Sequence, residues 1–132
     1  GVSDGELGFC SMDFDNGEVA AKKSYFFFGP EMIAVGSGIR SDSDAPVVTT
    51  AAQYRSDETV QNLENGQLTG SGDFAVRLLG GNCAEITVDS SEKEGNWKRV
   101  TDALPGKPVK ARLFTCTLNH GVKPKTAPTR IR

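Results

Sequence analysis

Residues 21–39 read AKKSYFFFGPEMIAVGSGI, and this stretch decides the fold. Its first half runs into a series of aromatics that ends at Phe28. Gly-Pro at 29–30 then interrupts the series, because proline fixes φ and cannot donate a ladder hydrogen bond. An apolar, β-branched segment follows as far as Ile39. The pattern predicts a β-hairpin from Lys22 to Ile39.

The aromatic series also predicts how the hairpin is packed. Successive side chains of a strand point to opposite faces, so the four aromatics from Tyr25 to Phe28 cannot share one face. We therefore expect both faces near Phe28 to be covered, with Tyr25 in the core. Gly36 and Gly38 fall on one face of the second strand and are expected to leave room for the phenylalanines.

The rest of the chain favours one all-β domain, an antiparallel β-sandwich, over residues 1–122. A chain of 132 residues with fifteen Gly and six Pro suits a single core with many turns, and no segment shows a sustained helical stripe. Residues 123–132 contain two prolines and scattered cations, which indicates an extended or disordered basic tail. Further strands are expected at 5–14, 47–54, 74–79, 84–88 and 109–119, and a weaker one at 97–100. The segment 55–73 is polar and glycine-rich, and Asn65-Gly66 within it is a turn signal.

Several kinds of site lack their usual signature. No apolar run approaches the roughly 18 residues that span a bilayer, and residues 1–6 show no basic-then-apolar leader pattern. Cys10, Cys83 and Cys116 are odd in number and lack C-x-x-C spacing, so we expect buried, unpaired thiols, no metal site and no cofactor. One disulfide with one thiol left over is the alternative.

Charge is distributed unevenly. From Lys98 onward there are nine basic residues and one acidic residue, Asp102, a net +8, whereas residues 1–97 carry six basic and sixteen acidic residues, a net −10. The simpler interpretation is that the two parts neutralise each other. The alternative is a polyanion-binding end, because clustered cations concentrate anionic partners.

Several phrases resemble the central β-sandwich domain of polysaccharide lyase family 8, the lyases of hyaluronan, chondroitin and xanthan. The specific match is the hairpin itself: Lys-Ser, an aromatic triplet, an acidic turn, and an apolar strand that ends in Gly-Ser-Gly-Ile at 36–39. Pro-Val-Val-Thr-Thr at 46–50, Gly-Asn-Trp at 95–97 and His-Gly-x-x-Pro at 120–124 resemble further phrases. The family's Tyr-Ala-Tyr strand after the His-Gly phrase is absent, and residues 127–132 stand in its place.

The resemblance implies part of a super-sandwich domain, because the family's central domain is about twice this long. Family members perform β-elimination on uronic acids with Asn, His, Tyr and Arg residues of a separate helical domain, so we expect no catalytic residue in this chain. The implied function is a non-catalytic module that supports the enzyme or contacts an acidic polysaccharide. Its implied location is extracellular or periplasmic, and a catalytic helical domain or a second copy would complete the sandwich.

Five residues are candidates for substrate binding: Asn96, Trp97, Lys98, Arg99 and His120. An aromatic plane can stack on a sugar, and Arg99 can pair with a uronate carboxylate. The alternative for Trp97 is a core plug at the end of the sandwich. His120, the only histidine, has an ordinary pKa near neutrality, and its alternative role is to close a strand by bonding a turn carbonyl.

Two other functions remain open from the sequence. One is a free-standing polyanion- or carbohydrate-binding protein that uses the basic C-terminal stretch, although nucleic acid is not the partner we expect. The other is an assembly module whose open sheet edge pairs with a partner chain.

Overall fold

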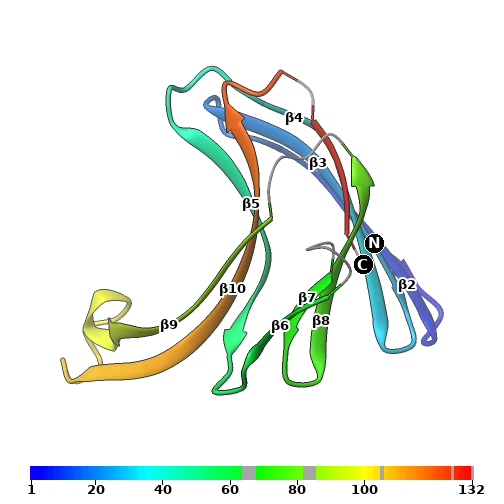
Figure 1. Cartoon of the computed structure of the whole chain (residues 1–132). Coiled ribbons are helices and arrows are strands. Elements are labelled where there is room, and N and C mark those ends of the chain that lie inside the picture. The colour runs from blue at the N-terminus through cyan, green and yellow to red at the C-terminus, as the bar shows by residue number, and fades with distance from the viewer. Residues whose placement is uncertain (64–67, 82–85, 105, 126, 132) are drawn as a thin grey trace.

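The computed structural model describes residues 1–63, 68–81, 86–104, 106–125 and 127–131 and shows two curved sheets that face each other (Figure 1). These residues contain no α-helix and every strand pair is antiparallel, so the predicted fold class is confirmed. The strands are β1 (Val2–Ser3), β2 (Leu7–Asp15), β3 (Val19–Phe28), β4 (Glu31–Ser41), β5 (Pro46–Arg55), β6 (Val60–Leu63), β7 (Leu68–Ser71), β8 (Phe74–Gly81), β9 (Ile86–Asn96), β10 (Pro108–Val122) and β11 (Ala127–Ile131).

The predicted hairpin is formed by β3 and β4. Phe28 pairs with Glu31 and Tyr25 with Ala34, so the Gly-Pro pair makes a two-residue turn, as the sequence indicated. The ladder continues to the far end of β3 with one bulge, beside which Gly38 has φ +61. Gly38 therefore serves the backbone, because this conformation is strained for residues with a Cβ.

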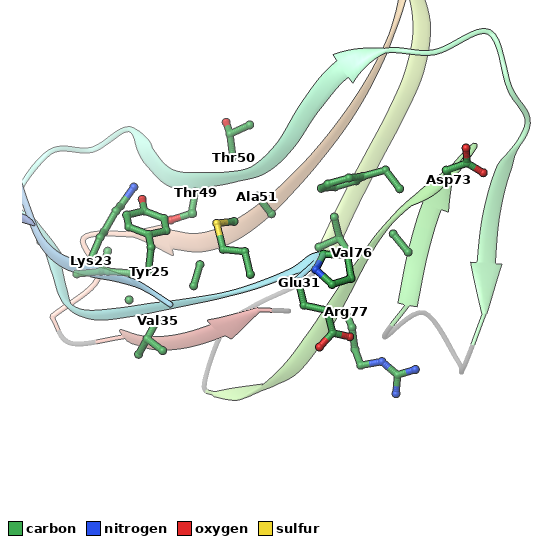
Figure 2. A pocket seen from close by; sticks show the side chains of 17 residues that line it. Lys23, Tyr25, Glu31, Val35, Thr49, Thr50, Ala51, Asp73, Val76 and Arg77 are labelled. Atoms are coloured by element: carbon green, nitrogen blue, oxygen red, sulfur yellow. The ribbon is translucent and has the colours of Figure 1, made fainter. Parts of the chain in front are cut away.

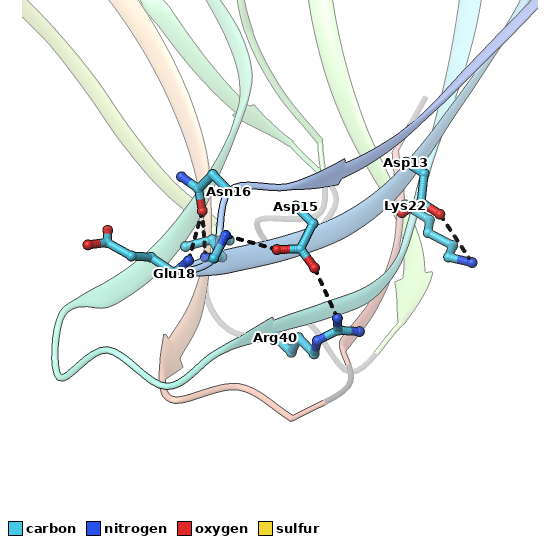
Figure 3. Close-up of polar contacts among 8 residues, drawn as sticks. Asp13, Asp15, Asn16, Glu18, Lys22 and Arg40 are labelled. Carbon is cyan, nitrogen blue, oxygen red and sulfur yellow. Dashed lines mark hydrogen bonds and ion pairs between the residues drawn. The ribbon is translucent and has the colours of Figure 1, made fainter.

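The turn between β2 and β3 is built from local side-chain bonds, which Figure 3 shows. The carboxylate of Asp15 accepts from the Gly17 amide at 2.9 Å, and the Asn16 side chain accepts from the Val19 amide at 2.8 Å. Asp15 also pairs with Arg40 of β4 at 3.2 Å. Asx bonds of this kind, with Gly17 at φ +86, are typical of a turn with the sequence Asp-Asn-Gly.

The strand order of the larger sheet is β1-β2-β3-β4-β11-β8-β7-β6, and that of the smaller sheet is β5-β10-β9. The segment expected to be a basic tail thus contains β11, an interior strand in which Thr129 pairs with Gly36 on one side and Gly81 on the other. Pro128 lies where the register against β4 shifts, a place where a strand tolerates the missing N–H. The chain therefore forms a strand after the His-Gly phrase without a Tyr-Ala-Tyr sequence.

The core lies between β10 and the middle of the larger sheet. Phe114, Cys116 and Leu118 alternate along β10 and are fully buried, and they pack against Val76 of β8. Partly buried side chains from both sheets surround them, including Ala34, Ala51, Tyr54, Leu78, Ile86 and Val88. Three fully buried side chains on the central strand of the smaller sheet hold the two layers together.

The outer strands β2 and β3 differ from expectation, because aromatic side chains there are not covered within the described chain. Phe26 is 41% exposed and Phe27, on the opposite face, is 42% exposed. Phe26 contacts Phe9 of β2 with ring centroids 5.0 Å apart, but no second layer lies over either ring. Alternation correctly placed the aromatics on two faces, whereas the smaller sheet has too few strands to cover them.

Two other expectations are corrected. The polar segment 55–73, for which the sequence predicted no strand, contains β6 and β7, and Trp97–Arg99 forms a 3₁₀ turn instead of a strand. The Asn65-Gly66 turn and Cys83 lie outside the described residues, as do 84–85 of the expected strand 84–88. Cys10 and Cys116 are both free thiols, and no described helix is long and apolar enough to cross a membrane.

Candidate functional site

Four of the five candidate residues lie at the tip of an arm formed by β9 and β10. β5 pairs with β10 only from Leu113 onward, whereas β9 pairs with β10 back to Pro108, opposite Asn96. The end of the β9–β10 hairpin therefore extends beyond β5, the third strand of the smaller sheet (Figure 1). We call residues 92–112 the arm and residues 96–107 its tip.

The arm tip is ordered by Asn96. Its side-chain oxygen accepts from the amide of Lys98 at 2.9 Å, and its side-chain nitrogen donates to the carbonyl of Gly106 at 2.8 Å. The amides of Val100 and Thr101 both donate to the Trp97 carbonyl, at 2.9 and 3.0 Å, and complete the 3₁₀ turn. Because one donor and one acceptor of its side chain are used locally, Asn96 holds the tip in this conformation.

Trp97 is not a core plug. Its side chain is 56% exposed, and the neighbouring Val100 and Leu104 are exposed as well, at 77% and 45%. An indole held at the end of an ordered hairpin presents a flat apolar surface that can stack on the C–H face of a sugar ring. The arm tip is therefore a candidate contact surface, as the sequence predicted from composition alone.

The charges of the arm divide into paired and unpaired groups. On its shaft, the Lys110 amino group lies 3.5 Å from Glu92 and 3.9 Å from Glu94, and Lys93 lies 2.7 Å from Asp89. At the tip, Lys98 and Arg99 make no ion pair with another described residue and are exposed. The tip is thus locally cationic although the whole chain is weakly acidic.

His120 belongs to a different place. It lies twelve residues beyond Pro108 on β10, about 40 Å along an extended strand, so it cannot share a site with the arm tip. It is 9% exposed, and its Nε2 is 2.9 Å from the Thr49 hydroxyl of β5. Burial, and secondarily the charge of Lys23, hold the pKa of His120 below its ordinary value of 6.5. Its partner is the Thr49 side chain, not the turn carbonyl of the alternative interpretation.

The structure also contains a cavity that sequence reasoning did not find. It lies between β3 and β4 on one side and β5 and β8 on the other, and Figure 2 shows its lining side chains. Lys23 and Tyr25 contribute from β3, so Tyr25, predicted to be core, is a half-buried wall residue. The available signal was the placement of Lys23 two residues before Tyr25, which puts a cation on the inner face of an apolar strand.

The chain matches the model of polysaccharide lyase family 8, super-sandwich domain, over residues 1–130. It is 27% identical over 139 residues to a chondroitinase-AC of Pedobacter heparinus, covering 96% of this chain and 20% of the relative. It is also 27% identical over 150 residues to a xanthan lyase of Bacillus sp. (strain GL1), covering 93% of this chain and 16% of the relative. The chain therefore spans a fifth or less of the length of these relatives.

A solved relative has the same fold. The chondroitin AC lyase of Streptomyces coelicolor A3, in complex with chondroitin sulphate, aligns with a TM-score of 0.83 at 18% identity, over 98% of this chain and 18% of the other. At that identity the alignment bears on the arrangement of the strands alone. The overall arrangement of the strands described above is therefore shared with a known lyase.

Proposed function

We propose a function from the premise that this chain belongs to polysaccharide lyase family 8, as a super-sandwich domain. The proposed function is that of a non-catalytic module of a polysaccharide lyase, which supports a catalytic domain and contacts a uronic-acid-containing polysaccharide through the arm tip. The relatives are named for chondroitin and xanthan, and one solved relative holds chondroitin sulphate. Transfer of those ligands to this chain is part of the proposal.

The observation that carries the proposal is the exposed Trp97 beside two unpaired cations. Its ring is 56% exposed, and Lys98 and Arg99 follow in the same 3₁₀ turn. Acidic polysaccharides combine apolar ring faces with regularly spaced carboxylate or sulfate groups. An indole face flanked by cations complements both features, and the cations also increase the rate of encounter.

The non-catalytic part of the proposal is supported by how the ionisable groups are used. β-Elimination requires a base near the C5 proton of the uronate and a proton donor near the leaving oxygen. The Nε2 of His120 is bonded to Thr49, and the Tyr54 hydroxyl is bonded to the backbone of Ser71 on both its donor and acceptor sides. In the family that this chain resembles, the catalytic groups belong to a helical domain.

The basic C-terminal stretch is not proposed as a separate binding site. Lys110 bonds to carboxylates of β9, Lys123 lies 2.7 Å from Asp44, and residues 127–131 are an interior strand of the larger sheet. These contacts favour neutralisation of the positive stretch by the acidic part of the chain. The unpaired cations of the arm tip are the part of that stretch we assign to polysaccharide.

The chain has a single tryptophan, so its fluorescence reports on the arm tip directly. Addition of chondroitin sulfate or xanthan is expected to change Trp97 emission saturably, and added salt is expected to weaken the affinity. Replacement of Lys98 and Arg99 together by Gln is expected to weaken binding roughly 5- to 30-fold. The control is Lys22→Gln, at an exposed lysine of β3 that pairs with Asp13 of β2, and this variant is expected to bind the polysaccharide normally. Unchanged Trp97 emission from the folded protein, or an equal loss of affinity in the Lys98 and Arg99 double variant and in Lys22→Gln, would exclude the arm tip as the contact.

A further inference from the structure

The cavity between the sheets is large enough for a small organic molecule. Its volume is about 640 Å³, within the roughly 300–1,000 Å³ of known ligand pockets. Its walls are strands: β3, β4 and β8 of the larger sheet and β5 of the smaller sheet. Because strands and not loops carry most of the lining residues, strand pairing sets the positions of these groups.

Most of the inner surface of the cavity is apolar. Four side chains from three strands have this character: Met32, Ala34, Ala51 and Val76. Glu31 and Arg77 also border the cavity, but they alternate with apolar residues along β4 and β8, so their side chains point away from its interior (Figure 2). An apolar ligand body would displace water from this surface, whereas a ligand with many hydroxyl groups would leave them without partners.

One end of the cavity carries a cation. Figure 2 shows Lys23 and Tyr25 of β3 at this end, with Thr49 on the facing strand β5. Lys23 is half-buried and forms no ion pair with any carboxylate in the described part of the chain. The preceding residue, Lys22, points to the opposite face of β3, where it is exposed and pairs with Asp13. Of these two adjacent lysines, only Lys23 reaches the cavity.

The side chains beside Lys23 supply no negative charge. The Thr49 hydroxyl lies 2.9 Å from Nε2 of His120, which is 9% exposed and whose Nδ1 has no hydrogen-bond partner in the described structure. The charge of Lys23 helps to lower the pKa of this imidazole, although burial lowers it more, so the two groups interact. Hydroxyl groups and an imidazole do not neutralise an ammonium group. A partly desolvated cation without a counter-charge is unfavourable, and an anion bound beside it would relieve this.

We propose that this cavity binds an amphiphilic carboxylate, a molecule with one anionic head group and an apolar body. The carboxylate lies at Lys23, where the Tyr25 hydroxyl, which makes no hydrogen bond to another described residue, can donate to it. The apolar body extends along the lining toward Val76. This inference goes beyond the proposed function and does not depend on it, because the cavity and the arm tip are formed by different strands.

The inference also predicts the stability of the chain without ligand. Lys23→Gln removes a charge that has no partner in the described structure, so this variant is expected to be at least as stable as the wild type in urea unfolding. A residue kept for ligand binding can reduce the stability of the free protein. If Lys23 had only a structural role, its replacement would instead destabilise the chain.

The test follows the ring resonances of His120 by NMR while octanoate is added to the whole chain. The signals are unique because the chain has one histidine, and the contact with Thr49 places that histidine at the cavity wall. Acetate tests the head group alone and 1-octanol the apolar body alone, and each is expected to bind at least roughly 10-fold more weakly than octanoate. Lys23→Gln is expected to weaken octanoate binding roughly 5- to 30-fold and Lys23→Arg to retain it, and Lys22→Gln, at the adjacent lysine, is the matched control with wild-type affinity.

The outcomes separate this inference from the arm-tip proposal. Saturable octanoate binding that requires Lys23, and is unchanged in Lys22→Gln and in Trp97→Ala, supports the cavity as the site. Equal affinities for octanoate and acetate would reduce it to a simple anion site, and equal affinities for octanoate and 1-octanol to an apolar pocket, and either result would overturn the inference. No saturable shift at His120, or unchanged octanoate binding by folded Lys23→Gln, would overturn it as well, while polysaccharide binding at Trp97 would still stand.

Discussion

Tyr54 joins the two sheets through its hydroxyl group, and its replacement by phenylalanine gives the sharpest test of the fold. The hydroxyl donates to the Ser71 carbonyl at 2.9 Å and accepts from the Ser71 amide at 3.1 Å, so β5 of one sheet is bonded to β7 of the other. The Tyr54 ring packs between Phe74 and Phe114, with centroids 5.2 and 4.9 Å away. Tyr54→Phe keeps this packing and removes both hydrogen bonds.

The expected cost follows from the burial of Ser71, which is 2% exposed. Two ordinary hydrogen bonds contribute about 1 kcal/mol each, and a buried amide and carbonyl left without partners raise the total toward 3 kcal/mol. Ser71 keeps its side-chain bonds to Ser56 at 2.7 Å and to the Glu58 carbonyl at 3.0 Å, which limits the damage. We expect Tyr54→Phe to lower the free energy of unfolding by about 2–3 kcal/mol.

The assay is urea unfolding followed by circular dichroism, which yields both the unfolding free energy and its urea dependence. The matched control is Tyr25→Phe, at the only other tyrosine, whose hydroxyl makes no hydrogen bond to another described residue. That change is expected to cost less than about 0.5 kcal/mol. Equal losses for the two variants, or a loss below about 0.5 kcal/mol for Tyr54→Phe, would refute the bonding scheme between the sheets.

Three further predictions test other parts of the molecule. Leu118→Ala, at a fully buried side chain, is expected to lower the free energy of unfolding by about 3–5 kcal/mol, whereas Leu104→Ala, at 45% exposure, is expected to lower it by less than about 1 kcal/mol. Similar losses for the two variants in urea unfolding would contradict the assigned core. Because the pKa of His120 is lower in the folded than in the unfolded chain, its contribution to stability is fully present above about pH 6.5 and declines as the pH falls from there through the folded pKa. The urea unfolding midpoint, measured against pH, should show this decline in the wild type and less of it in His120→Asn. An equal decline in both proteins would contradict the prediction. Truncation after Lys125 removes β11 from the interior of the larger sheet, so cooperative unfolding in calorimetry should be lost; a stable truncated chain would show that β11 is dispensable.

Most of the strands were predictable because the local signals agreed with the long-range pairing. In the hairpin, the alternation, the Gly-Pro turn and the β-branched second strand all indicate the same register, and the structure has that register. β10 was predictable for a similar reason, since Phe114, Cys116 and Leu118 alternate with polar residues and all three are fully buried. Agreement between local sequence signals and long-range strand pairing is typical of natural sequences.

The strands that were missed lack local signals and depend on their neighbours. β11 contains a proline and cations, which suggest a tail, but its backbone pairs with β4 and β8, and the proline lies at a register shift. β6 and β7 are short and lie in a polar, glycine-rich segment, and β7 pairs with both β6 and β8. Tertiary pairing overrides weak propensity in these segments.

The candidate site was predictable only in part. The tip residues are adjacent in sequence, so their shared location was predictable. The sequence did not decide whether Trp97 is exposed or buried at the end of the sandwich. His120 was grouped with them by its chemistry, yet β10 separates the two places by most of its length. The cavity could not be predicted, because its lining residues come from β3, β4, β5 and β8, which are far apart in sequence and meet only in the folded chain.

The central claim is that this family 8 domain contacts an acidic polysaccharide without cleaving it. The most direct measurement incubates the pure chain with chondroitin sulfate, at concentrations where Trp97 fluorescence shows saturation, and records the ultraviolet absorbance of unsaturated uronate. The account predicts a saturated fluorescence change with no increase in absorbance. A steady, enzyme-dependent increase in absorbance would contradict it, because it would show that the domain itself carries out β-elimination.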